Sequence, residues 1–298
     1  MSSSAFLSSS SASPVGVFDS GIGGLSVLQE LRSELPYENF VYLADSGNAP
    51  YGERGDEFVK QRTLAIARHL LDEHRIKALV VACNTATTAA VAQLREALPD
   101  LPVIGVEPAL KPAASSSQTH RVGVIATRGT VQSARFEQLR QAFSDGTEFR
   151  AQACDGLVRA IERSVEEEDS EAASSPAAIE IRELCERYTA MLGSFGVRTG
   201  DIDTLVLGCT HYVFIKDELR KLLGPDVHII DTGAPVARQT RRILVQRDTL
   251  APEADDSAPS TVRRGTLQLY TTGRLGALQA AAKRWLQLPP EHCHALAA

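Results

Sequence analysis

Two cysteines stand directly after short apolar runs, and the residues that follow each could assist proton transfer. Cys83 ends "ALVVAC" and precedes an Asn-Thr pair, whereas Cys209 ends "LVLGC" and precedes a Thr-His pair. A thiol has an ordinary pKa of about 8.5, which a helix N-terminus can lower, so it can exchange protons near neutral pH. The two corners therefore predict acid–base or nucleophilic thiol chemistry.

Alternating strands and helices must position these cysteines. Such alternation predicts βαβ units around a mostly parallel sheet, the arrangement of an α/β protein. The apolar patterns predict strands at 15–18, 40–43, 78–82, 102–106, 121–126, 148–154, 203–207 and 227–230, and helices at 25–35, 56–75, 131–143, 179–192 and 215–223, with a further helix behind Cys83 that reaches Leu98.

The chain carries the same plan twice. The segment "VGVFDSG" at 15–21 is similar to "VGVIATRG" at 122–129, and "LVVACNT" at 79–85 is similar to "LVLGCTH" at 205–211. We therefore expect two similar α/β lobes related by a pseudo-twofold axis. Ligands of open α/β sheets bind at the carboxyl ends of the strands, which puts both thiols at a cleft between the lobes.

Two thiols on opposite sides of one carbon favour racemisation, in which one thiolate takes a proton and the other thiol donates one to the opposite face. Two other classes stay open. Cys209 with His211 could transfer an acyl group through a covalent intermediate, leaving Cys83 dispensable. A non-catalytic, two-lobed carboxylate-binding protein would leave both thiols unexplained. Taken alone, Asp19 would be read as a helix N-cap.

Composition excludes several partners. The net charge of −6 argues against a nucleic-acid surface and against anionic lipid, and no apolar run approaches the roughly 20 residues that span a bilayer. Five cysteines without close spacing predict a reduced, cytoplasmic protein without a metal site. Cys154 and Cys185 are expected to pack in the core. Residues 1–13 are interpreted as a disordered Ser-rich leader and 289–298 as a flexible tail.

The motifs "VGVFDSGIGGLSVL", "DSGNAPYG", "ACNTAT", "GVIATRGTV" and "GCTHY" occur in an order that resembles the cofactor-independent aspartate/glutamate racemase family, up to "YTTG" at 270–273. The resemblance implies a first lobe of 14–107 plus 227–288 and a second of 108–226. It implies interconversion of L- and D-glutamate for peptidoglycan, with aspartate or another amino acid as the alternative substrate. It implies no cofactor, and a homodimer as the partner state, which the helix faces do not decide.

The resemblance also implies roles for single residues. Cys83 would deprotonate the D-enantiomer with help from Asp19, and Cys209 the L-enantiomer with help from His211. The implied substrate contacts are Ser20, Pro50, Tyr51, Gly52, Asn84, Thr85, Thr127, Thr130 and Thr210. The chain departs from the family pattern at Val213, where proline is usual, and at Asp155 in "ACDGLVRAIE", a stretch to which no role is assigned.

Overall fold

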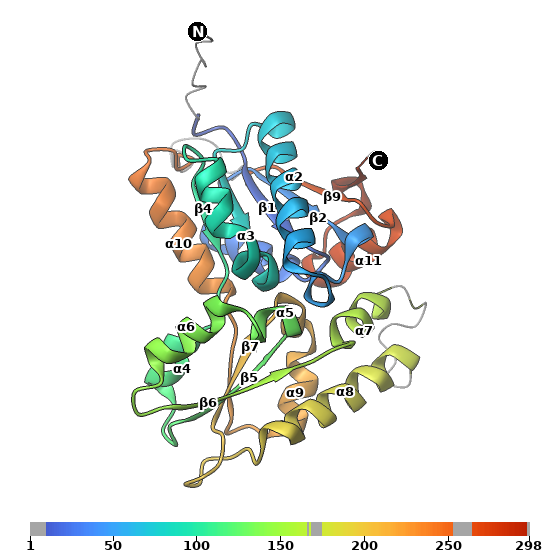
Figure 1. The fold of residues 1–298 in the computed structure, drawn as a ribbon. Coiled ribbons are helices and arrows are strands. Elements are labelled where there is room, and N and C mark those ends of the chain that lie inside the picture. The colour runs from blue at the N-terminus through green and yellow to red at the C-terminus, as the bar shows by residue number, and fades with distance from the viewer. Residues whose placement is uncertain (1–9, 166, 168–174, 253–263, 297–298) are drawn as a thin grey trace, which may run out of the picture.

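Two parallel sheets, each covered by helices, lie one above the other in the computed structural model, which describes residues 10–165, 167, 175–252 and 264–296 (Figure 1). One sheet has six strands in the order β10-β9-β2-β1-β3-β4, and the other has four in the order β6-β5-β7-β8. Every pairing between these strands is parallel.

The central strands are short and buried on both faces, as expected for a parallel sheet covered by helices. The strands are β1 (Val15–Asp19), β2 (Phe40–Ala44), β3 (Ala78–Val81), β4 (Val103–Gly105), β5 (Arg121–Ala126), β6 (Glu148–Ala153), β7 (Thr204–Gly208), β8 (His228–Ile230), β9 (Leu267–Thr271) and β10 (Cys293–Ala295). Each predicted strand is present within one residue of its expected limits.

The helices cover the two sheets and continue from the strand ends. They are α1 (Leu25–Glu34), α2 (Asp56–His74), α3 (Asn84–Ala97), α4 (Leu110–Ser116), α5 (Arg128–Val131), α6 (Ala134–Phe143), α7 (Leu157–Ser164), α8 (Pro176–Leu192), α9 (Lys216–Leu223), α10 (Gly233–Gln246) and α11 (Leu275–Leu286). Short 3₁₀ segments occupy Ser46–Asn48, η2 (Tyr51–Glu53), η3 (Thr210–Ile215) and Pro290–His292.

The repeated strand order confirms two similar α/β lobes. β2-β1-β3-β4 and β6-β5-β7-β8 share one order, in which β1 corresponds to β5, and β3, which precedes Cys83, corresponds to β7, which precedes Cys209. Apolar clusters fill both faces of each sheet. The carboxyl ends of both sets of strands point toward the junction between the sheets (Figure 1).

The expected segment boundaries need three corrections. β8 was placed in the first lobe but pairs with β7, because its apolar residues extend the second sheet. The prediction of a flexible tail at 289–298 is wrong as far as residue 296. There β10 pairs with β9, and Cys293 is buried in the apolar core of the first lobe. The prediction of a disordered leader is wrong for residues 10–13, because Asn39 Nδ2 donates to Ala12 O at 2.9 Å. Residues 1–9 lie outside the described residues.

Two local expectations also change. The predicted helix at 131–143 is divided, because Ser133 caps α6 while "TRGT" begins the short helix α5. The helix predicted at 179 starts at 176, where Ser175 accepts from the backbone of Ala178 and a proline occupies the first turn. The acidic run at 166–171, which the sequence predicts to be a solvated insertion, lies mostly outside the described residues.

We propose that the first lobe comprises residues 14–107 and 231–296 and the second lobe residues 108–230. These two names are used below. Within the described residues, no helix is both long and apolar enough to cross a membrane.

A buried ion pair supports the first lobe at the start of β3. Lys77 and Glu38 are joined by a 2.6 Å Nζ–Oε2 contact, and their side chains are 0% and 2% exposed. Lys77 Nζ also donates to the carbonyl oxygens of Ser11 and Thr249, at 2.6 and 2.7 Å. The ammonium group thus joins four segments below the strand that leads to Cys83.

We expect Lys77→Met to lower the free energy of unfolding by about 3–5 kcal/mol, because Glu38 would keep a buried charge without its partner. Urea denaturation measures the change. The double variant Lys77→Met/Glu38→Gln should be more stable than Lys77→Met alone. If the double variant loses as much free energy of unfolding as the two single variants added together, Lys77 and Glu38 do not stabilise the fold as a pair.

Candidate active site

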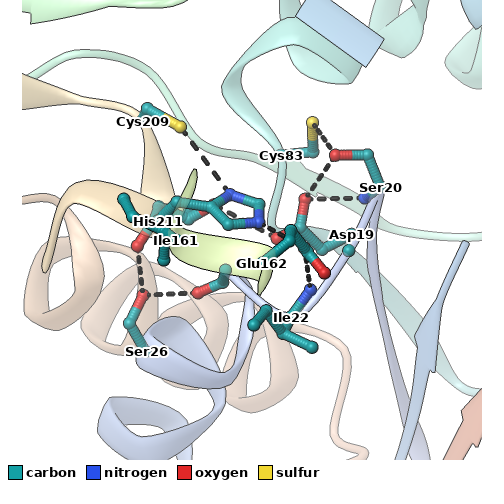
Figure 2. Close-up of polar contacts among 12 residues, drawn as sticks. Asp19, Ser20, Ile22, Ser26, Cys83, Ile161, Glu162, Cys209 and His211 are labelled. Carbon is teal, nitrogen blue, oxygen red and sulfur yellow. Dashed lines mark hydrogen bonds and ion pairs between the residues drawn. The ribbon is translucent and has the colours of Figure 1, made fainter. Parts of the chain in front are cut away.

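The two cysteines predicted from the sequence lie on one cavity between the lobes. Cys83 follows β3 and Cys209 follows β7, and Figure 2 shows their sulfur atoms entering the site from opposite sides. The cavity is lined by Asp19, Ser20, Pro50, Tyr51, Gly52, Cys83, Asn84, Thr85, Thr127, Val158, Cys209, Thr210 and His211. The structure therefore brings together every predicted site residue except Thr130, and adds Val158.

Thr130 lies behind the wall of the cavity. Thr127 Oγ1 donates to Thr130 Oγ1 at 3.1 Å, and the side chain of Thr130 is fully buried. Thr127 Oγ1 also lies 2.8 Å from Thr85 Oγ1 of the first lobe. Thr130 is thus placed to orient Thr127, which reaches the cavity itself.

Cys83 lies at the first turn of α3, in a buried polar environment. Its Sγ accepts from the backbone N–H of Ala86 at 3.5 Å and faces Ser20 Oγ at 3.5 Å, and Ser20 Oγ donates to Asp19 Oδ1 at 3.3 Å. Burial raises the pKa of the Cys83 thiol well above its usual range, and the carboxylate of Asp19 raises it further against the two hydrogen bonds. Cys83 is therefore a thiol in this closed arrangement.

Asp19 is buried and connects the two lobes. It accepts from the backbone N–H of Ser20 at 2.7 Å and from Thr210 Oγ1, in the second lobe, at 3.1 Å. Burial raises the pKa of Asp19, while the nearby His211 and the N–H of Ser20 act in the opposite direction. Asp19 therefore acts on the thiol of Cys83 by its charge, and Ser20 lies between the two side chains.

Cys209, His211 and Glu162 form a chain on the other side of the cavity. His211 Nδ1 lies 3.8 Å from Cys209 Sγ, and His211 Nε2 lies 2.6 Å from Glu162 Oε1 (Figure 2). Burial alone would lower the pKa of His211, but the contacts with Cys209 and Glu162 together raise it well above its ordinary value. These contacts favour the imidazolium form of His211, which lies between a carboxylate and a sulfur.

The glycines of "DSGIGG" make room for this chain. A Cβ at Gly23 would lie 2.3 Å from the ring of His211, and one at Gly21 would lie 2.0 Å from Glu162 Oε1. The backbone N–H of Ile22, between them, donates to the same Oε1 at 2.9 Å. The glycines thus allow the second lobe's side chains to approach the first lobe closely.

A separate carboxylate fixes the loop that carries Tyr51. Tyr51 OH donates to Asp45 Oδ2 at 2.6 Å, and Arg62 binds both oxygens of Asp45 at 2.7 and 3.0 Å. The hydroxyl of Tyr51 is therefore already used within the first lobe. The residue can contribute its ring and backbone to the cavity.

Apart from Asp19, His211 and the two thiols, uncharged donors and acceptors line the cavity, with no lysine or arginine among the described residues that form it. Asn84 Oδ1 is buried and accepts no hydrogen bond from the described protein, and the first turn of α3 presents backbone N–H groups. Such an arrangement suits carboxylate and ammonium groups of a small ligand. In the part of the chain that the structure describes, no three His, Cys, Asp or Glu side chains are placed to hold a metal ion.

Glu162 is the functional residue that the sequence did not reveal. It lies on α7, whose apolar Leu157, Val158 and Ile161 follow a helical spacing that could have indicated the helix. The partner of Glu162, however, is His211, 49 residues further along the chain. No local signal identifies such a contact.

Comparison with known proteins agrees with this geometry. Residues 24–240 match the sequence profile of the Asp/Glu/Hydantoin racemases. The chain belongs to this racemase family. A glutamate racemase of Ectopseudomonas mendocina is 49% identical over 82% of this chain and 86% of its own length.

Solved structures of racemases are similar over nearly the whole chain. Glutamate racemase of Escherichia coli, in complex with L-glutamate and the activator UDP-MurNAc-ala, gives a TM-score of 0.74 at 30% identity, over 92% of this chain and 95% of its own. That of Francisella tularensis, in complex with D-glutamate, gives 0.75 at 26% identity, over 96% and 98%.

In this member of the racemase family, we expect Asp19→Asn to speed alkylation of Cys83 by iodoacetamide at fixed neutral pH. Removing the carboxylate charge lowers the pKa of the Cys83 thiol, and one pKa unit corresponds to about a tenfold larger thiolate fraction. Peptide mass spectrometry measures the rate at Cys83 relative to that at Cys209 in the same sample. An unchanged or smaller ratio would contradict the assigned effect of Asp19.

Proposed function

We propose that the chain is a glutamate racemase, which interconverts L- and D-glutamate by proton transfer at Cα between two thiols and supplies D-glutamate for peptidoglycan. The observation that carries the proposal is the pair of cysteines on opposite sides of one interlobe cavity. The glutamate racemases among its relatives support glutamate as the substrate.

The cavity offers groups that match an amino acid. Hydroxyls of Thr85, Thr127 and Thr210 can bind carboxylate oxygens, and the unpartnered Oδ1 of Asn84 can accept from the α-ammonium group. Negative charge moves toward the α-carboxylate as the Cα–H bond breaks, so donors fixed at that point lower the barrier. These donors follow the ends of β3, β5 and β7.

The two thiols are prepared for opposite tasks. The raised pKa of Cys83 makes it the proton donor. His211, held by Glu162 on its other side, lies 3.8 Å from Cys209 Sγ, so we propose Cys209 as the base that acts on L-glutamate. Cys209 then takes the α-proton of L-glutamate, and Cys83 gives its proton to the opposite face. The enzyme is left with Cys83 as the thiolate, ready to deprotonate D-glutamate.

The cellular setting forms part of the same proposal. The cysteines of the described structure are all free and buried, which fits a reduced compartment, and we propose the cytoplasm. We further propose a homodimer, on the resemblance to the family alone. Light scattering during size-exclusion chromatography tests the oligomeric state.

The deciding experiment is proton NMR of the purified protein with L-glutamate or D-glutamate in D₂O, without added cofactor. We expect the Cα proton signal to disappear from either enantiomer while optical rotation decays to zero. The same measurement with aspartate decides between substrates. If the Cα proton signal and the optical rotation both persist with glutamate and with aspartate, the racemase proposal is overturned.

Cys83→Ser and Cys209→Ser provide the variants for that experiment. Each should lower racemisation by roughly 10²–10⁴-fold, because a positioned acid–base group contributes that much. Near-normal turnover in either variant would contradict the two-thiol mechanism.

One observation favours a second candidate, an acyl transferase or hydrolase. Cys209, His211 and Glu162 have the order of a nucleophile, its base and the group that orients the base. This candidate requires a covalent adduct at Cys209, visible by intact mass, and full activity in Cys83→Ser. The racemase requires neither.

We expect Glu162→Gln to move the alkaline limb of the pH profile of kcat/KM to lower pH. Glu162 helps raise the pKa of His211, and the imidazolium is lost as pH rises through that pKa. Losing the carboxylate lowers the pKa, so the loss occurs earlier. Activity at neutral pH should fall about tenfold, less than for a proton-transferring group itself.

The control is Glu137→Gln, an exposed carboxylate that pairs with Arg140 on α6. It should leave the profile unchanged. Because enantiomers have equal free energies, kcat/KM must change equally for L- and D-glutamate in every variant. An alkaline limb that stays in place in Glu162→Gln would show that His211 is not held by Glu162.

A further inference from the structure

The site in this structure is closed. The cavity between Cys83 and Cys209 has about 10 Å³ of free space, close to what a single water molecule needs. An amino acid is many times larger. A ligand can therefore reach the thiols only when the lobes separate, and the route must begin at a larger opening.

A larger cavity adjoins the closed one. It has a volume of about 420 Å³, within the range of small-molecule sites. Pro50 and Val158 line both cavities, and Glu162, which contacts His211, lies in the wall of the larger. Both lobes form its walls: Ser46, Gly47, Ala49, Pro50, Gly273, Arg274 and Ala277 come from the first lobe, and Val158, Arg159, Glu162 and Arg163 from the second.

Three arginines line this larger cavity, whereas none lines the closed one. Arg159 and Arg163 lie one turn apart on α7, and Arg274 precedes the first turn of α11. Glu162 is the acidic residue among the lining side chains. The planar guanidinium group binds carboxylates in a two-point geometry, so the lining favours an anion.

Two of these arginines pair with carboxylates that are open to solvent. Arg159 contacts Glu53 of the first lobe at 2.7 Å, and its side chain is 60% exposed. Arg163 contacts Glu180, and its side chain is also largely exposed. Ion pairs that are open to solvent are weak, so a ligand carboxylate can compete for these arginines. The Arg159–Glu53 pair also joins the lobes beside η2, which carries Tyr51 and Gly52.

We propose that this cavity, here called the arginine vestibule, is the entrance through which an anionic amino acid reaches the thiols, held by Arg163 and Arg274 before the lobes part. The proposal rests on the proposed function for the identity of the substrate. The closed cavity holds no lysine or arginine of its own among the described residues. The arginines of the vestibule attract an anion and so raise the local concentration of the substrate at the entrance.

The test compares two alkylating reagents that differ in charge. Anionic iodoacetate and neutral iodoacetamide are reacted with Arg163→Gln/Arg274→Gln and with the wild-type chain, and modification of Cys83 and Cys209 is followed by peptide mass spectrometry. We expect the iodoacetate-to-iodoacetamide rate ratio to fall about three- to tenfold in the variant. The ratio of the wild-type chain should fall with added salt, and that of the variant much less.

The matched control is Arg140→Gln/Arg247→Gln, which removes the same charge at exposed positions away from the vestibule. Its rate ratio should equal that of the wild-type chain. A ratio that is unchanged in Arg163→Gln/Arg274→Gln, or that falls equally in the control, would overturn the proposal.

A second variant tests the route independently of charge. Ala277→Trp, on the vestibule wall, should slow modification of both cysteines by both reagents, provided that its melting temperature matches the wild-type chain. Unchanged rates would place the entrance elsewhere. If Ala277→Trp does not fold, the charge comparison decides alone.

These thiol readouts need no turnover, so they separate this proposal from the proposed function. If glutamate is racemised, kcat/KM should also fall several-fold in Arg163→Gln/Arg274→Gln, with kcat nearly unchanged. If the protein does not racemise glutamate but its iodoacetate-to-iodoacetamide rate ratio depends on these arginines, the vestibule proposal stands and the proposed substrate is wrong.

Discussion

Two carboxylates, the buried Asp19 and the half-buried Glu162, each accept a hydrogen bond from the opposite lobe. Asp19 of the first lobe accepts from Thr210 of the second, and Glu162 of the second lobe accepts from the backbone N–H of Ile22 of the first. A buried carboxylate without donors is costly, so these contacts favour closure of the lobes. These two interlobe contacts also bear on both cysteines, because Asp19 raises the pKa of Cys83 and Glu162 raises that of His211 beside Cys209.

The two carboxylates also make the two sides of the site unequal. On the first side, burial and the nearby Asp19 carboxylate raise the pKa of Cys83, against the hydrogen bonds from Ala86 and Ser20. On the second side, Glu162 acts through an imidazole and places a positive charge beside Cys209. The two lobes share one fold, but the polar groups beside Cys83 differ from those beside Cys209. That inequality is what a resting enzyme needs if one thiol is to donate while the other accepts.

Closure and opening have to coexist in such a protein. Contacts that join the lobes include hydrogen bonds, such as Ser26 Oγ to Thr210 O at 3.2 Å, and one parallel aromatic stack, in which the rings of Phe214 and Trp285 are 3.6 Å apart. Polar contacts can be exchanged for water or ligand at small net cost. The interface therefore suits lobes that separate and close again, which a site with room for about one water molecule requires.

The sequence by itself determined the strands β1 to β8, the duplicated plan and the positions of Cys83 and Cys209 at strand ends, whereas β9 and β10 were not predicted. These features rest on local periodicity and on the rule that parallel strands present their carboxyl ends at one edge, so the residues that follow each strand meet. The ordered motifs also indicated the family, and all but one of the predicted site residues line the cavity.

Only the tertiary structure decided which sheet receives β8, that β10 covers the edge of β9, and that Glu162 faces His211. Each of these contacts joins segments of different elements, and β8 and β10 are too short to carry a pattern that names their partners. Thr130 was placed behind Thr127 for the same reason, because a hydroxyl on a short helix shows no preference for cavity or core until the neighbouring elements have packed.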